Sequence, residues 1–518
     1  MRCAAVAQPV VVPRPDPGLV VGWPRSTGAP HGLRGREPTV EPDLGHASEG
    51  SERMSAALST DHPALPACPP GREGSPGCAA PSGRTARARR SSDEPDGATD
   101  VLVVGGGIVG LTAAWRASRA GLRVSVLDPS PGDGATHAAA GMLAPVTEAD
   151  FGEEAALRLG ADSAGRWPAF AAELEADSGL DVGLRATGTL TLAYDGDDLA
   201  LGRRVRALQE AWGLDSTEIT VAAAREREPL VGQRVAGAFW APGDHQVDPR
   251  AVHRALTAAL ARDPRAAVVR RRAVRLLRSP GPDAPVTGAL DDAGVEHRAG
   301  TVVLAAGADS GSLLTDVPEV CAPTRPVKGQ TLRLDAPAWF TLDHVVRGVV
   351  QGRPVYVVPR TPGPDGHREV VVGATSEEHP DDRRATAGGV FALLRDARAL
   401  LPGLDELALV EVTPRVRPGT PDNLPLLGPT SVPGLVLATG HYRNGVLLAP
   451  VTGAAVDALL AGDPLPPTVA AIDPMRFSPA LLPAPPREVE ASRRGRGSEP
   501  STSTTGLYLG APASRRTP

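Results

Sequence analysis

Apolar residues follow two different periods along the middle of this chain. Short β-branched runs of strand length, "DVLVV" (100–104) and "RVSVLD" (123–128), flank "IVGLTAAWRASRA" (108–120), whose apolar positions recur at helical spacing. A longer helical pattern covers 156–179. Strand-like runs then predict strands near 187–195, 301–304, 329–334, 354–360, 368–375 and 434–440. This mixture of periods predicts a fold of the α/β (α+β) class.

The two ends of the chain lack such periods. Residues 1–98 and 478–518 are dominated by Pro, Gly, Ala, Ser and Arg. Segments of this composition bury too little apolar surface to offset their chain entropy. We therefore expect a disordered leader (1–98), a folded core (99–477) and a disordered tail (478–518).

Charge and cysteine content exclude several classes of function. The formal net charge is −6, and the core has no concentrated basic stripe, which argues against a nucleic-acid partner. The basic run "RTARARR" (84–90) lies in the leader, where solvation is its ordinary state. Cys3, Cys68 and Cys78 also lie there, which leaves Cys321 in the core. A single core cysteine predicts no disulfide framework, no metal site and a cytoplasmic location. The sequence contains no run of eighteen or more apolar residues, so we expect no membrane-spanning helix.

The first predicted strand and helix enclose a nucleotide-binding signature. Gly105, Gly107 and Gly110 form G-x-G-x-x-G, whose glycines allow a tight turn, a close approach to pyrophosphate and helix packing. Asp128 ends the next strand, where a carboxylate accepts hydrogen bonds from ribose hydroxyls. The combination predicts a dinucleotide site. The glycine- and alanine-rich run "PSPGDGATHAAAGMLAP" (129–145) replaces the next strand of a nicotinamide dehydrogenase and favours FAD.

Several motifs together resemble one family. "GGGIVG", "ATHAAAGMLAP", "RPVKGQTLRL", "VYVVPR", "VVGAT", "RVRPGTPDNLPLLG" and "GHYRNGVLLAPVTG" occur in the order found in FAD-dependent glycine oxidases of thiamine biosynthesis, within the D-amino-acid and sarcosine oxidase group. The resemblance implies a glutathione-reductase-type FAD-binding Rossmann domain interleaved with a substrate domain on a mixed or antiparallel sheet. The FAD-binding segments would be about 99–180, 245–320 and 420–477, and the substrate segments about 181–244 and 321–419.

The resemblance also assigns the active site. Arg417 would pair the substrate carboxylate, Arg443 would be a second substrate contact, and Tyr356 would orient the substrate. Met142 would lie over the flavin beside the substrate. A surface salt bridge is the alternative for Arg417, and core packing is the alternative for Tyr356 and Met142. The polar half of "GHYRNGVLLAPVTG" (440–453) would line the site, and its apolar half would form a buried helix.

The resemblance further implies a set of cofactor contacts. They are Gly105, Gly107, Ile108, Val109, Gly110, Asp128, Pro129, Ala135, Thr136, Ala140, Gly141, Met142, Val274, His441, Tyr442, Arg443, Asn444, Gly445, Val446 and Leu447.

One stretch departs from the family pattern. Thr413, Pro414 and Arg415 stand where the family has an aromatic residue, Ala and Gly. Arg415 lies two residues from Arg417, on the same strand face, so we expect it to enlarge or recharge the site. No cysteine follows Cys321, so we expect noncovalent FAD.

The implied activity is oxidation of glycine to its imine, with molecular oxygen reduced to hydrogen peroxide. The imine would hydrolyse to glyoxylate and ammonia or pass to a thiazole-forming enzyme, and we expect a homo-oligomer. Three alternatives stay open: an oxidase of sarcosine, proline or a D-amino acid, a flavin dehydrogenase serving another electron carrier, and a nonenzymatic FAD-stabilised scaffold.

Overall fold

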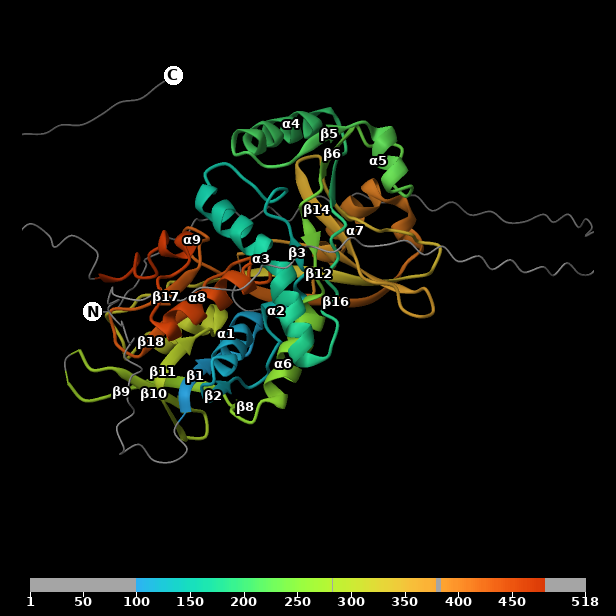
Figure 1. Cartoon of the computed structure of the whole chain (residues 1–518). Helices are drawn as coiled ribbons and strands as arrows, with labels where there is room; N and C mark the ends of the chain where they lie inside the picture. The colour runs from blue at the N-terminus through green and yellow to red at the C-terminus, as the bar shows by residue number, and fades with distance from the viewer. Residues whose placement is uncertain (1–98, 282, 379–382, 480–518) are drawn as a thin grey trace, which may run out of the picture. The chain divides into compact units, whose positions relative to one another are not determined.

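The fold is built on two large sheets with helices packed against them (Figure 1). The computed structural model describes residues 99–281, 283–378 and 383–479. The predicted leader, with its basic run and its three cysteines, lies outside the described residues, as does the predicted tail from residue 480 onward.

The first sheet is mainly parallel. Its central strands β11, β1, β2 and β8 run parallel to one another, β18 joins them in parallel, and β17 is antiparallel at the edge. In spatial order the strands are β17 (Leu426–Pro429), β18 (Leu435–Thr439), β11 (Glu296–Leu304), β1 (Thr99–Val104), β2 (Val124–Leu127) and β8 (Ala266–Val269). An antiparallel extension continues from β11 through β10 (Val286–Asp291) to β9 (Ala273–Arg278).

Both faces of this sheet are buried, which explains the unbroken apolar run of β1. Val101 and Val103 belong to the cluster under the helices, and Leu102 and Val104 belong to the cluster on the opposite face. Parallel strands covered on both faces are typically apolar at every position. The opposite face is covered by the β9–β10–β11 extension, by the 3₁₀ helix η1 (Gly307–Leu314) and by residues that follow it.

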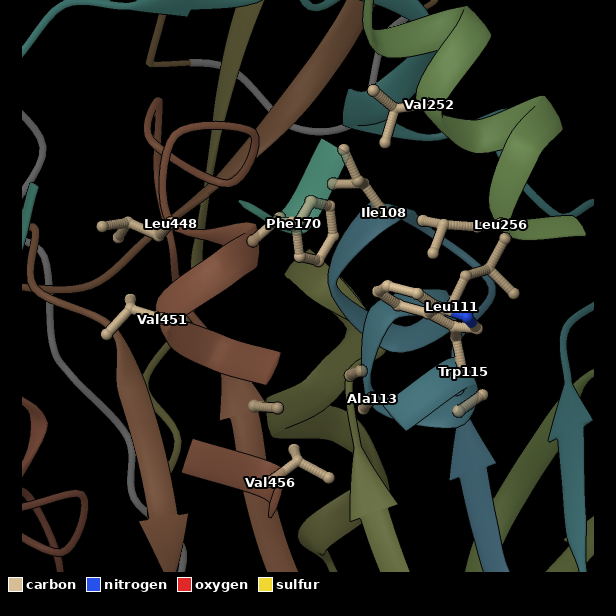
Figure 2. Close-up of a cluster of buried hydrophobic side chains, with 14 of the residues drawn as sticks. Ile108, Leu111, Ala113, Trp115, Phe170, Val252, Leu256, Leu448, Val451 and Val456 are labelled. Carbon is tan, nitrogen blue, oxygen red and sulfur yellow. The ribbon is translucent and has the colours of Figure 1, made fainter. Parts of the chain in front are cut away.

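Helices far apart in sequence share one side of the first sheet. In the core that they enclose, Trp115 meets Phe170 edge to face at 5.2 Å between ring centroids (Figure 2). Leu111, Val252, Leu256, Val451 and Val456 belong to the same core. The helices are α1 (Ile108–Arg119), α3 (Glu154–Ser178), α6 (Pro249–Arg262), α8 (Ala449–Ala461) and the short α9 (Pro467–Ala470).

The second sheet is mixed. β13 and β4 pair in parallel, and the other described neighbours are antiparallel. In spatial order the strands are β16 (Ala408–Gly419), β12 (Arg325–Ala336), β15 (Arg368–Gly373), β14 (Arg353–Pro359), β13 (Val345–Val350), β4 (Thr189–Ala193), β6 (Gly237–Ala241) and β5 (Thr217–Ile219).

One face of the second sheet has its own apolar core. Leu332, Val357 and Val372 pack there with Leu393 and Leu400. The latter two belong to α7 (Ala387–Leu400), which is followed by the 3₁₀ helix η2 (Pro402–Glu406). The β5–β6–β4 end carries α4 (Gly196–Ala211) and α5 (Val221–Arg227) (Figure 1).

A short segment links the two sheets. It contains α2 (Ala135–Ala138) and β3 (Met142–Leu143), which pairs with β7 (His245–Gln246). The mixed α/β fold class predicted from the sequence is confirmed. The strands of the first sheet come from 99–127, 266–304 and 426–439, and those of the second come from 189–241 and 325–419. Ser478, which the sequence placed in the tail, is buried, and its Oγ accepts a hydrogen bond from the Cys321 amide at 3.1 Å. The fold therefore extends past residue 477.

The core under α3 gives a direct stability prediction. Leu174 is fully buried, so Leu174→Ala should lower the free energy of unfolding by about 2–5 kcal/mol through lost apolar contact and a residual cavity. Leu409→Ala is the matched control, because Leu409 is 46% exposed and should cost less than about 0.5 kcal/mol. Urea unfolding of both variants measures the difference, and equal costs would contradict this account of the core.

Candidate functional site

A large cavity lies where the two sheets face the linking segment. Its volume is about 1310 Å³. Ligand pockets typically occupy roughly 300–1,000 Å³, so this cavity has room for a ligand of dinucleotide size. Its walls come from the β1–α1 turn, residues 128–142, strands of the second sheet and residues 438–446.

The glycines of the first turn are required by backbone contacts. Gly105 has a φ of +111°, and a Cβ there would lie 2.3 Å from the carbonyl oxygen of Ala305. A Cβ on Gly110 would lie 2.0 Å from the carbonyl oxygen of Gly105. The turn therefore brings bare backbone and the start of α1 to the cavity, where a helix N-terminus favours phosphate. The Ile108 amide donates to Thr136 Oγ1 at 3.0 Å, which ties α1 to the linking segment.

Asp128 is oriented by two backbone amides. Its Oδ2 accepts a hydrogen bond from Gly106 at 2.6 Å, and its Oδ1 accepts one from Ser130 at 2.7 Å. The carboxylate lines the cavity beside Pro129 and keeps further lone pairs for hydroxyl groups. The glycine cradle and this carboxylate together fit the adenosine diphosphate half of FAD.

The linking segment presents small residues to the middle of the cavity. Ala140, Gly141 and Met142 line it. Gly141 has a φ of +79°, and a Cβ there would lie 2.0 Å from the carbonyl oxygen of Val247. Small residues of this kind let a flat ring approach the backbone, which fits the isoalloxazine end of the same cofactor.

A cluster of charged side chains lies beyond this segment. Glu148 accepts a hydrogen bond from Arg347 Nη1 at 2.7 Å and lies 3.9 Å from Arg443 Nε. Burial opposes ionisation of Glu148, but the charges of Arg347, Arg443 and Arg417 outweigh it and lower the pKa of this carboxyl. Glu148 is therefore a carboxylate at neutral pH. Glu148 and Arg347 were missed by the sequence reasoning, although an arginine inside the apolar run "HVVRGVV" (344–350) is a signal that could have found Arg347.

Arg417 reaches the cavity across the neighbouring strand. A Cβ on Gly329 of β12 would lie 2.3 Å from Arg417 Nη1, so a glycine is needed beneath the guanidinium. Nη1 donates to the Thr375 carbonyl at 3.1 Å. Within the described ranges, Arg417 makes no ion pair. Its charge is therefore available to a ligand.

Tyr356 lies beside these charges on β14. A Cβ on Gly373 would lie 2.3 Å from the tyrosine Oη, so glycine again makes room. Burial raises the pKa of Tyr356, and Glu148 adds to this effect, while Arg417 and Arg347 oppose it. The phenol is therefore neutral and able to donate a hydrogen bond.

The stretch 440–453 differs from its prediction in two ways. Helix α8 begins at Ala449, so Val446 to Leu448 form turns instead of the start of a buried helix, because Pro450 occupies the first helical turn. The position of Arg443 beside an apolar run also predicted that it is buried, but Arg443 is exposed, and its Nη2 donates to Glu153 at 3.3 Å. His441 is buried, with Nε2 3.0 Å from Thr452 Oγ1.

Arg415 lines the cavity, as the strand-face argument implies, but its charge is already engaged. Its Nη2 donates to Asp133 Oδ1 at 2.6 Å and its Nε donates to the Asp133 carbonyl at 2.7 Å. The departure from the family pattern therefore ties β16 to the loop after Asp128 and does not add a second uncompensated cation.

Residues 100–459 match the family described as FAD dependent oxidoreductase. The chain belongs to this family. The resemblance drawn from the sequence motifs is thereby confirmed, and FAD is the cofactor of the family.

Individual relatives agree with the family assignment. The chain is 34% identical to the glycine oxidase of Geobacillus kaustophilus over 361 residues, which cover 68% of this chain and 90% of the relative. The crystal structure of glycine oxidase from Geobacillus kaustophilus superposes with a TM-score of 0.63 at 31% identity, covering 71% of this chain and 95% of that one. A bifunctional protein ThiO/ThiG of Nostoc sp. is 34% identical over 372 residues, covering 71% of this chain. The chain spans about half of the length of that relative, 54%.

Most residues assigned to FAD from the sequence line the cavity, and three do not. Gly110 packs against Gly105, Leu447 belongs to the apolar core, and the Asn444 carbonyl accepts a hydrogen bond from the Leu448 amide at 2.8 Å. The lining residues are Gly105, Gly107, Ile108, Val109, Asp128, Pro129, Ala135, Thr136, Ala140, Gly141, Met142, Val274, His441, Tyr442, Arg443, Gly445 and Val446. Their contacts with FAD stay a prediction.

The described part of the chain offers neither a metal-binding cluster nor a helix that could span a membrane. In residues 99–281, 283–378 and 383–479, His, Cys, Asp and Glu side chains form no group of three or more suited to a metal ion. Over the same ranges, every helix is too short or too polar to span a membrane.

Because Gly110 packs tightly against the backbone, replacing it with a larger residue should disrupt the cofactor site. Gly110→Ala would force the β1–α1 turn open, so FAD affinity should fall at least tenfold and the protein should be destabilised by more than about 1 kcal/mol. Gly165→Ala is the matched control, because this glycine also lies in a helix but nothing is within 4 Å of its Cβ. Fluorescence titration of apoprotein with FAD measures the effect, and unchanged affinity in Gly110→Ala would contradict it.

His441 predicts a pH dependence of stability. Burial lowers its pKa from 6.5 to about 4. Between these values the unfolded chain binds a proton that the folded chain does not bind, so stability falls as the pH falls through this window. The total loss should be up to about 3 kcal/mol, and it is absent above the unfolded pKa.

Urea unfolding from pH 7.5 to 4 would measure this effect. His441→Gln should flatten that part of the profile, whereas His367→Gln, at a histidine whose side chain is 46% exposed, is the control. Equal slopes in His441→Gln and the parent protein would rule out this origin.

Proposed function

We propose that the protein oxidises glycine, or a small amino acid derived from it, at this site. The observation that carries the proposal is the charge balance of the pocket. Arg347 and Arg443 are compensated by Glu148 and Glu153, whereas Arg417 has no recorded ion pair among the described residues. One uncompensated guanidinium in a half-buried pocket is suited to one carboxylate, which its planar fork can bind in bidentate fashion.

Each residue that lines the proposed substrate site has a separate role. Arg417 holds the substrate carboxylate, and the neutral phenol of Tyr356 donates a hydrogen bond to the bound substrate. Met142 and the residues of the 440–446 turn limit the substrate to the side of the cavity that faces the linking segment. When bound, FAD supplies the two-electron acceptor for the α-carbon hydride and delivers the electrons to dioxygen, which gives hydrogen peroxide.

No general base is required if the substrate amine is neutral when it reacts. Glu148 is engaged by Arg347, so it orients this arginine and lowers the positive charge around the amine. The imine product then hydrolyses to glyoxylate and ammonia or is taken up by a second enzyme. The similarity to a bifunctional ThiO/ThiG protein supports a thiazole-forming enzyme as the recipient and a role in thiamine biosynthesis.

Three further expectations belong to the same proposal. Cys321 does not line the cavity, which supports noncovalent FAD. The cytoplasmic location and the homo-oligomeric state stay predictions from the sequence. The cofactor and substrate segments stay those given by the sequence, about 99–180, 245–320 and 420–477 for FAD and about 181–244 and 321–419 for the substrate.

Arg417 provides the sharpest test. In Arg417→Lys the positive charge remains but the fork is lost, so kcat/KM for glycine should fall about 100-fold or more while FAD stays bound. Arg158→Lys is the control, because Arg158 is an exposed arginine of α3.

Anaerobic reduction of the flavin by glycine, followed by absorption, reads out the chemical half-reaction directly. Unchanged reduction in Arg417→Lys would remove Arg417 from the site. If glycine failed to reduce the parent protein, glycine would be excluded as the substrate.

A further inference from the structure

The floor of the cavity is a single row of residues that crosses the second sheet. Cross-strand pairing places Thr331 opposite Gly373, Gly373 opposite Tyr356, and Tyr356 opposite Arg347. The row continues from Arg347 to Thr191 and from Thr191 to Phe239. All six residues line the cavity, so they share one face of the sheet.

This floor changes character along its length. Its polar residues Tyr356 and Arg347 lie on β14 and β13, whereas Phe239 lies on β6 at the other end. Arg417 of β16 is outside this row and lines the same cavity. Val349 on β13 faces the same cavity, and helix α4 contributes Leu201 and Val205. A Cβ on Gly202 would lie 2.4 Å from Phe239 Cε2, so this glycine lets α4 lie directly on the phenylalanine ring. The far end of the cavity is an apolar arm, defined here by Leu201, Val205, Phe239 and Val349.

The arm is longer than glycine requires. Tyr356 and Phe239 are three strand spacings apart, which is roughly 14 Å. The non-hydrogen atoms of glycine span less than about 4 Å. A substrate held at Arg417 therefore leaves the arm unfilled unless it carries a substituent.

The amide and carboxylate side chains near the arm are engaged, whereas the buried Thr191 hydroxyl beside Phe239 has no hydrogen-bond partner among the described residues. Gln209, which lines the cavity from α4, donates its Nε2 to the Val146 carbonyl at 2.8 Å. Asp244 holds the same loop by accepting hydrogen bonds from the Val146 and Thr147 amides at 3.0 and 2.6 Å. The arm therefore favours an apolar group over a charged one. Phe151 and Leu201, which are 51% and 39% exposed, form its rim.

We propose that the apolar arm binds an aliphatic substituent of about three to six carbons on the substrate amino acid, and that Leu201, Val205 and Phe239 determine this specificity. The inference rests on the proposed amino-acid oxidase function and deepens it. The carboxylate remains at Arg417, and the substituent, on the amine nitrogen or on the α-carbon, extends across β13 and β4 toward β6. Each methylene that enters the arm should raise kcat/KM about fourfold, the value expected for its removal from water.

The test uses the FAD-loaded full chain and two series of substrates. Glycine, N-ethylglycine and N-butylglycine form one series, and D- and L-2-aminobutanoate and 2-aminohexanoate form the other. Anaerobic stopped-flow reduction gives the limiting rate and the apparent Kd for each compound. We expect kcat/KM to rise at least tenfold from glycine to the four-carbon substituent in one series, which also identifies the point of attachment.

Val205→Phe fills the apolar arm from α4 and is the variant that tests the proposal. It should remove the gain for the longer substrates and leave glycine within twofold of the parent protein. Val295→Phe is the matched control, because Val295 is 52% exposed and lies outside the cavity. If Val205→Phe does not fold, Leu201→Trp at the rim serves the same purpose, and FAD content checks both variants.

The outcomes separate this inference from the proposed function. A fall in kcat/KM with each added carbon in both series, with glycine still active, overturns the arm and leaves the oxidase. Equal slowing of all substrates by Val205→Phe shows an access path and also overturns the arm. Reduction of the flavin by the longer substrates but not by glycine supports binding in the arm and shows that the substrate is a longer amino acid than glycine. Reduction by none of them overturns both proposals.

Discussion

The buried guanidinium groups of Arg333 and Arg360 hold the linking segment in place between the two sheets. Arg333 is 1% exposed and donates to the His137 carbonyl at 3.2 Å. Arg360 donates to the carbonyls of Ala140 at 2.8 Å and Val247 at 3.1 Å. Burial of a guanidinium is costly unless it is paired and hydrogen-bonded, so these arginines depend on the carbonyls that they bind and on Glu369, which forms an ion pair with each of them. The backbone that faces the cofactor is thereby fixed without belonging to either large sheet.

The same network sets the distance between cofactor and substrate groups. Arg250 of α6 donates to both oxygens of Glu411 on β16, at 3.0 and 2.8 Å, and these hydrogen bonds lower the pKa of Glu411 to about 2. The strand that Glu411 anchors also carries Arg417. Because α6 packs on the first sheet and β16 forms the edge of the second, this ion pair couples the position of the nucleotide fold to Arg417, the residue that we propose binds the substrate carboxylate. Catalysis by positioning requires that kind of rigid connection.

Local sequence predicts the parts of the site that local physics determines. The G-x-G-x-x-G turn, Asp128 and the β1 and α1 boundaries follow from glycine sterics and apolar periods within thirty residues of one another. Glu148 and Arg347 are 199 residues apart in sequence and meet because the chain packs the loop between β3 and α3 against β13, a long-range contact that periodicity does not encode. The start of α8 at Ala449 was misjudged because an apolar run alone does not distinguish turns from a buried helix, whereas Pro450 marks the first turn.

The order of strands in the second sheet explains why one cavity can be polar at one end and apolar at the other. Each step along the floor changes strand, so neighbouring residues in space come from distant parts of the sequence and can differ freely in character. Arg347 is the boundary: its charge is engaged by Glu148, and beyond it the floor continues through Thr191 to Phe239. A ligand that fits both ends must carry its anion toward β16 and its apolar atoms toward β6. In the proposed binding mode, the sheet therefore specifies the direction in which a substrate lies, before any contact with the cofactor is considered.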